Sequence, residues 1–97
     1  MRNIVFRPEA RADALGAFAF YEKRRPGLGV EFRNHMDFAI SRILENPERY
    51  PLIYRGLHRR LVERFPYAIL YGVYPEAVVV VAVMHGRQDP DVWKRRT

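Results

Sequence analysis

The chain has 97 residues, enough for one domain with one hydrophobic core and too few for two, so residues 1–97 are expected to form a single domain. Its 48% hydrophobic and 29% charged residues exclude a disordered chain, and the absence of cysteine excludes disulfides and thiolate metal sites. The net charge of +6 arises from 17 basic residues, fifteen of them arginine, against 11 acidic ones, which favours a nucleic acid or an acidic protein as partner.

The first half of the chain predicts one strand followed by two helices. Residues 3–7 alternate apolar side chains, as a short strand does. Residues 8–25 begin with a proline suited to a first helical turn and continue as an amphipathic helix, which Pro26-Gly27 breaks. Residues 28–45 repeat apolar side chains at three- and four-residue steps, and Asn46-Pro47 ends this second helix. The two helices are expected to form an antiparallel hairpin.

The second half of the chain changes its apolar period from 3.6 to 2. Residues 57–64 alternate, and residues 67–74 form a second strand rich in aromatic and branched side chains. Residues 77–84 are apolar on both faces, as expected for a central strand, and residues 91–96 predict a last helical turn. The order β-α-α-β-β-β predicts an α+β fold, an antiparallel sheet with the N-terminal helical hairpin packed on one face.

The strand at 57–64 also carries the densest basic stretch of the chain. Alternation separates its side chains into Leu57 and Leu61 on one side, and His58, Arg60, Val62 and Arg64 on the other. If the helices cover the leucine side, Arg60 and Arg64 line the opposite, concave face of the sheet, while Arg59 points away. Solvated charges at a sheet edge are the alternative interpretation.

The sequence predicts a soluble, cytoplasmic protein without a membrane contact. Its start has no segment of signal-peptide character, and its longest apolar run, residues 77–84, is far below the ~20 residues that span a bilayer. His35 and His58 lack the partner spacing of metal ligands, so neither a metal nor another cofactor is expected.

Five short motifs, in this order and spacing, resemble the RelE/ParE superfamily of bacterial type II toxins over nearly the whole chain. They are Gly27-Leu28-Gly29-x-x-Phe32, Asn46-Pro47-Glu48, Arg59-Arg60, Phe65-Pro66-Tyr67-x-Ile69-x-Tyr71 and His85-Gly86-Arg87-x-x-Pro90-x-x-Trp93. The resemblance implies a growth-inhibiting toxin of a plasmid-stabilisation type, held inactive by a cognate antitoxin encoded beside it. The antitoxin of such a pair is an acidic, DNA-binding protein through which the complex represses its own operator DNA.

The resemblance leaves two targets open, DNA gyrase for ParE-like members and mRNA on the ribosome for RelE-like endonucleases. RelE-type nucleases carry an arginine after the tyrosine that opens the third strand, where this chain has Ala68. They also carry a catalytic tyrosine six residues beyond an arginine that matches Arg87, where this chain has Trp93, whose indole cannot transfer a proton at neutral pH. These departures favour a ParE-like gyrase inhibitor that is not an enzyme.

Two alternatives remain at this stage. The resemblance to YoeB-type members implies a metal-independent endoribonuclease that would use His85 as acid or base, with Arg60, Arg64 and Arg87 around the phosphate. The other alternative is a protein that keeps the toxin fold as a binding module without toxicity.

The residues expected to contact the target or the antitoxin are Arg59, Arg60, Arg64, Tyr71, His85, Arg87, Trp93 and Arg95. Each has a structural interpretation beside the functional one. Trp93 would pack the terminal turn against the sheet, Tyr71 would belong to the core, and His85 would cap the end of its strand.

Overall fold

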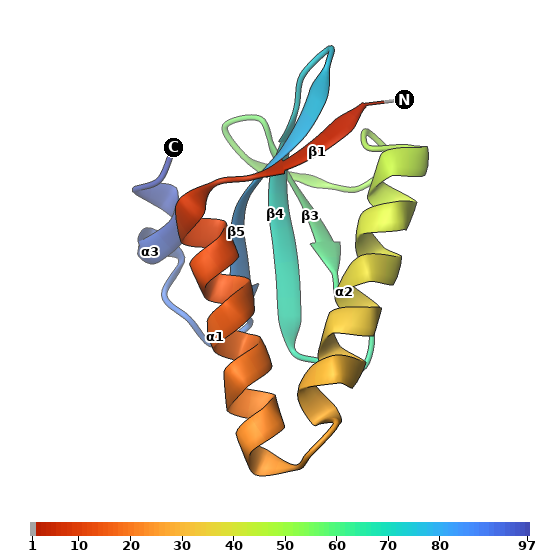
Figure 1. The fold of residues 1–97 in the computed structure, drawn as a ribbon. Coiled ribbons are helices and arrows are strands. Elements are labelled where there is room, and N and C mark those ends of the chain that lie inside the picture. Colours follow the sequence, from red (N-terminus) through yellow and green to blue (C-terminus); the bar gives the residue numbers. More distant parts are fainter. Residues whose placement is uncertain (1) are drawn as a thin grey trace.

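The computed structural model describes residues 2–97 and shows a five-stranded sheet with a helical hairpin against one face (Figure 1). The elements are β1 (Asn3–Phe6), α1 (Pro8–Arg24), α2 (Leu28–Glu45), β2 (Leu52–Tyr54), β3 (Leu57–Leu61), β4 (Tyr67–Val73), β5 (Ala77–His85) and α3 (Pro90–Lys94). The strand order is β1-β5-β4-β3-β2, with β1 parallel to β5 and the other neighbours antiparallel. The predicted α+β class, the helical hairpin and the central position of β5 are confirmed.

The prediction missed strand β2 and made β3 too long. Strand β2 has three residues between Pro51 and the turn at Arg55 and Gly56, which is too short for a periodic pattern to show. Strand β3 ends at Leu61 rather than Arg64, because residues 63–66 turn the chain back into β4.

The hairpin turn is fixed by Glu22 of α1. Its carboxylate accepts hydrogen bonds from the backbone N–H groups of Gly27 at 2.9 Å and Gly29 at 3.0 Å, at the start of α2. Gly27 has a φ of 90°, which favours glycine, and a Cβ on Gly29 would lie 2.7 Å from the Phe18 carbonyl oxygen. The Gly-x-Gly motif therefore lets the two helices meet and join tightly.

The main core lies between the hairpin and the sheet. Its fully buried side chains include Phe32, Ile43, Ile69, Val80 and Val83, and each contributes about 1.5–3 kcal/mol on burial. At the hairpin end, Phe65 packs edge-on to Tyr21 at 4.9 Å and Tyr67 to Phe32 at 5.2 Å, between ring centroids. The Phe-Pro-Tyr motif thus anchors the β3–β4 turn to both helices.

Tyr71 belongs to this core and is wholly buried. Its hydroxyl donates a hydrogen bond of 2.7 Å to the Pro47 carbonyl, and its ring stacks on the His58 ring with centroids 5.3 Å apart. His58 Nδ1 lies 2.7 Å from the Tyr50 carbonyl oxygen, so Nδ1 carries the proton of that hydrogen bond. Burial raises the pKa of Tyr71.

The predicted orientation of β3 is wrong. His58 pairs with Tyr71 and Arg60 with Ile69, two partners that face the hairpin, so His58 and Arg60 face the hairpin as well. Arg59 and Leu61 point to the opposite face of the sheet, called the open face below, where Leu61 is 58% exposed. Alternation separates two sets of side chains, but it does not tell which set the helices cover.

Candidate functional surfaces

Arg60 is not on the open face, contrary to the prediction. Its side chain is only 12% exposed, and its guanidinium lies 5.3 Å from the ring centroid of Tyr50. The guanidinium donates to the carbonyl of Leu61 and approaches the Glu63 carboxylate at 3.4 Å, while its Nε has no partner within the described residues. These contacts leave Arg60 little surface for a ligand.

The neighbouring arginines do not join Arg60 in a common hollow. Arg64 is exposed in the turn after β3, with a φ of 66°, and Arg59 is exposed on the open face. The predicted basic face of Arg60, Arg64 and His58 is therefore wrong, since two of these side chains lie on the hairpin side and the third lies in a turn.

His85 is held in the turn that follows β5. Its Nδ1 accepts a hydrogen bond of 3.0 Å from the backbone N–H of Arg87, and its own N–H donates to the Gln88 side-chain oxygen at 2.8 Å. Its ring meets Tyr67 edge-on, with centroids 5.2 Å apart. Strand β4 separates His85 from Arg60, because β3 and β5 are two strand spacings or roughly 10 Å apart.

The remaining predicted residues fall in three environments. Trp93 packs α3 onto a small second core of Leu70, Ala82 and Met84 on the open face. Tyr71 is buried and cannot contact a partner, so its predicted binding role is not supported by its position. Arg87 and Arg95 are exposed.

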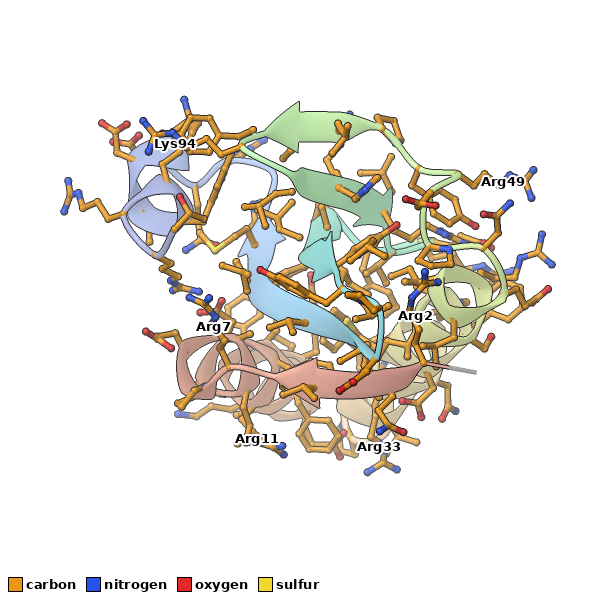
Figure 2. The ribbon with its side chains drawn as sticks, turned by 90° about the horizontal axis from the view of Figure 1, so that it is seen from above. Arg2, Arg7, Arg11, Arg33, Arg49 and Lys94 are labelled. Atoms are coloured by element: carbon orange, nitrogen blue, oxygen red, sulfur yellow. The ribbon has the colours of Figure 1, made fainter. Side chains whose placement is uncertain are left out.

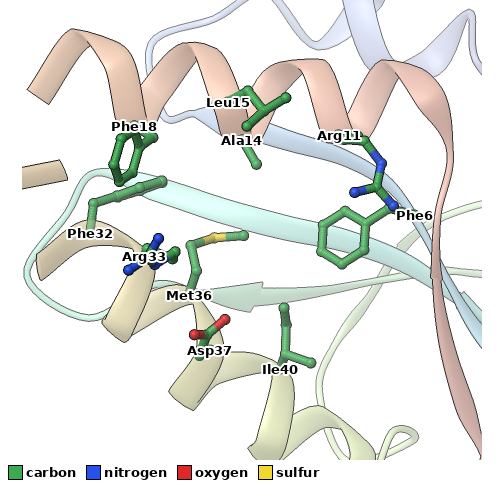
Figure 3. Close-up of a pocket in the computed structure, with 10 residues that line it drawn as sticks. All are labelled: Phe6, Arg11, Ala14, Leu15, Phe18, Phe32, Arg33, Met36, Asp37 and Ile40. Carbon is green, nitrogen blue, oxygen red and sulfur yellow. The ribbon is translucent and has the colours of Figure 1, made fainter. Parts of the chain in front are cut away.

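A groove between the two helices, called the hairpin groove below, is one of the hollow surfaces of the molecule (Figure 3). It encloses about 300 Å³ and is lined by Phe6, Arg11, Ala14, Leu15, Phe18, Phe32, Arg33, Met36, Asp37 and Ile40. Leu15 is 63% exposed at its margin, and the Arg33 guanidinium lies 5.7 Å from the Phe18 ring centroid. The groove is apolar inside and carries two guanidinium groups and one carboxylate around it.

The second hollow lies on the open face, between β3 and α3, and is called the open-face hollow. It encloses about 390 Å³. Its lining includes the buried Leu70 and Met84, the exposed Leu61 and the partly buried Trp93. Arg59 and His85 also line it. The rest of its lining is Ile53, Val62, Phe65, Pro66, Tyr67, Ala68, Gly86, Gln88 and Pro90.

Sequence reasoning found parts of the open-face hollow but missed the hairpin groove. It predicted two amphipathic helices packed as a hairpin, whereas the apolar side chains of Phe18, Phe32, Met36 and Ile40 also line a groove that is open to solvent. Leu15, an apolar residue beside the predicted stripe, was the available signal, because the stripe is wider than one helix contact needs.

Comparison with known proteins identifies the family. The family profile described as "ParE toxin of type II toxin-antitoxin system, parDE" matches residues 4–90. The chain belongs to the ParE toxin family. The resemblance to RelE/ParE toxins, on the ParE side, is thereby confirmed.

A solved structure supports the fold of this ParE family member. A chain of the "Chromosomal ParDE TA system from P. aeruginosa" is similar to it with a TM-score of 0.76 and 13% identity, over 88% of this chain and 96% of that one. No match was found among curated proteins. Within residues 2–97, none of the helices has both the length and the apolar character needed to cross a membrane.

Proposed function

We propose that this ParE family member inhibits growth by acting on DNA gyrase and is neutralised by a cognate antitoxin. The observation that carries the choice of target is the separation of the groups that an endoribonuclease would need. Metal-independent RNA cleavage requires an acid, a base and cations around one phosphate. Arg60 is packed under Tyr50 on β3, and His85 lies beyond β4 at the end of β5.

The two positions that distinguish RelE-type nucleases support the same proposal. Ala68 faces the open-face hollow and offers no cation there. Trp93 is packed against the second core and meets Tyr54 edge-on, with ring centroids 5.7 Å apart. The methyl side chain of Ala68 cannot bind a phosphate, and the indole of Trp93 carries no positive charge and cannot transfer a proton at neutral pH.

For the antitoxin, we propose that it lays an amphipathic helix in the hairpin groove. The groove follows about two turns of each helix, from Arg11 to Phe18 and from Phe32 to Ile40, and its interior is apolar. A helix with apolar side chains at three- and four-residue spacing fits such a groove. Its carboxylates would meet Arg11 and Arg33, which lie on the same side of the molecule (Figure 2).

The target is tested with purified toxin and two substrates. Gyrase is assayed for supercoiling and for stabilised gyrase–DNA cleavage complexes, and mRNA is assayed for cleavage on ribosomes. Inhibited supercoiling with intact mRNA supports the proposal. If the mRNA is instead cut at defined codon positions and His85→Ala abolishes the cuts, the protein is a nuclease. If it is inactive in both assays and harmless when expressed, it is a binding module.

The antitoxin surface is tested with Leu15→Glu and the protein encoded by the reading frame beside the toxin gene. Placing a charge in the apolar groove is expected to weaken this complex by at least about ten-fold, the scale of an interface hot spot. Phe38→Glu, at an exposed apolar residue of α2 outside the groove, is the matched control. Equal affinities of both variants and the wild type would contradict the proposed docking site.

A further inference from the structure

We propose that this toxin binds its target protein with the open-face hollow. The target contributes an acidic patch from which an apolar side chain protrudes into the hollow. The inference rests on the proposed function, since it assigns the target to one face of the molecule. It also separates the target surface from the hairpin groove, on the other side of the sheet.

The apolar part of the hollow is shaped to receive a side chain. Leu61 is 58% exposed at the hollow, next to other apolar lining residues, and a contiguous exposed apolar surface of this kind marks an interaction site. Trp93 of α3 also lines the hollow and packs against the buried Leu70 and Met84, which line it too. An apolar side chain that enters between Leu61 and Trp93 would bury surface on both sides.

The charges around the hollow select an acidic partner. Arg59 lines the hollow. The Lys94 ammonium lies 5.1 Å from the Tyr54 ring centroid and 5.8 Å from that of Trp93, which lines the hollow. The Arg55 guanidinium lies 5.3 Å from the Tyr54 ring centroid. None of these three cations forms an ion pair with a carboxylate of the described residues. They are therefore available to carboxylates of a partner.

Asp89 and Asp91, the acidic residues next to Lys94 in the sequence, form no ion pair with it among residues 2–97. Asp89 caps α3 by accepting a hydrogen bond of 3.0 Å from the backbone N–H of Asp91. Both carboxylates stand at the N-terminus of α3, whereas Lys94 stands at its C-terminal end.

The two hollows are separate but touch at one end. Among residues 2–97 they share no lining residue, whereas Phe65 and Tyr67 of the open-face hollow pack edge-on against Phe32 of the hairpin groove. Figure 2 places Arg11 and Arg33 on one side of the molecule and Lys94 on the opposite side. Leu61 and Leu15, the two positions substituted in the tests, take no part in these ring contacts, so a change at either one should leave the shape of the other hollow unchanged.

The test uses Leu61→Glu in the full-length toxin, with gyrase inhibition and antitoxin binding measured on the same preparation. We expect the concentration for half-inhibition of supercoiling to rise by at least about ten-fold, because a charge is placed in an apolar contact. Binding to the protein of the adjacent reading frame should change less than about two-fold, which also shows that the variant is folded. Phe38→Glu, on an exposed side chain in neither hollow, should inhibit gyrase as the wild type does.

A second variant tests the charge. Arg59→Glu should raise the half-inhibition concentration further than Arg59→Ala, because it turns attraction for an acidic patch into repulsion. If the wild-type toxin fails to inhibit gyrase, the proposed function is wrong. If the wild type inhibits gyrase and Leu61→Glu and Arg59→Glu do so equally well, the function stands and the open-face hollow is not the target surface.

Discussion

Replacing Arg96 with alanine removes an ion pair that ties the end of the chain to α1 and β5. The Arg96 guanidinium donates two hydrogen bonds to the Asp13 carboxylate, at 2.6 and 3.2 Å, and one to the Val81 carbonyl at 3.2 Å. Asp13 also accepts the backbone N–H of Val83 at 3.0 Å. Strand β1 pairs with β5 only as far as Val80. Beyond Val80, Asp13 and Arg96 supply hydrogen bonds to the backbone of β5 that a neighbouring strand would otherwise make.

The expected loss follows from the burial of the pair. The Arg96 and Asp13 side chains are 15% and 17% exposed, so removing one partner leaves the other charge largely buried. Breaking a fully buried pair costs about 3–5 kcal/mol, and the remaining exposure of this pair lowers the expected loss in unfolding free energy to about 2–3 kcal/mol. For a domain of this size, such a loss lowers the melting temperature by roughly 10–20 °C.

Urea and thermal unfolding of Arg96→Ala, Asp13→Ala and the double variant measure this prediction. The double variant leaves neither charge without its partner. Its loss of unfolding free energy should therefore be smaller than the sum of the two single losses by about 1–3 kcal/mol. Arg95→Ala, at an exposed neighbour, is the control and should change the unfolding free energy by less than about 0.5 kcal/mol. An Arg96→Ala loss no larger than that of Arg95→Ala, or strictly additive losses, would refute the reasoning.

Three further predictions concern pH, the hairpin turn and salt. Burial raises the pKa of Tyr71, Tyr67 and Tyr21 above the ordinary tyrosine value of 10.0, so their contribution to stability is complete below that pH and is lost above it. The unfolding free energy should fall as the pH rises above 10, by about 1.4 kcal/mol per pH unit per group while only the unfolded chain ionises. Tyr71→Phe should make this fall of the unfolding free energy with pH less steep in urea unfolding. Glu22→Ala leaves the N–H groups of Gly27 and Gly29 without their acceptor and should cost about 1–3 kcal/mol in the same assay, whereas an unchanged midpoint would contradict this role. Association of this basic toxin with an acidic antitoxin should slow several-fold with added salt in stopped-flow measurements, and a rate constant independent of salt would exclude electrostatic steering.

The elements that could be predicted are those with a local physical cause. The period of α2, the proline that begins α1 and the break at Pro26-Gly27 act through neighbours in the sequence, and their predicted bounds agree with the structure to within one residue. The pairing of β1 with β5 joins residues more than 70 positions apart, and no local pattern carries that information.

The prediction of the candidate site failed at β3, because a long polar side chain can be accommodated on either face of a strand. The Arg60 guanidinium lies over the Tyr50 ring and approaches the Glu63 carboxylate, so a residue predicted as exposed is largely buried. Leu61 is the converse, an apolar residue left in solvent. A pattern of polar and apolar residues orients a strand reliably only when its polar side chains cannot be satisfied inside.

The hairpin groove was not predictable because it depends on how far the two helices splay. Phe18 and Met36 have the spacing of core residues, and the sequence shows nothing that distinguishes a closed helix contact from an open one. In Figure 1 the helices approach each other at the hairpin turn and diverge toward β1. The groove is thus a property of the tertiary arrangement rather than of either helix.

Charge alone does not distinguish the two proposed partners of this toxin. Arg11 and Arg33 border the hairpin groove, and Arg59 lines the open-face hollow, so an acidic protein is attracted to both sides of the molecule. Selectivity must then come from the apolar interiors, since one groove follows two helices and the other hollow lies between a strand and Trp93. Salt should therefore slow association with both partners together, whereas a charge placed at one exposed leucine should weaken only one complex.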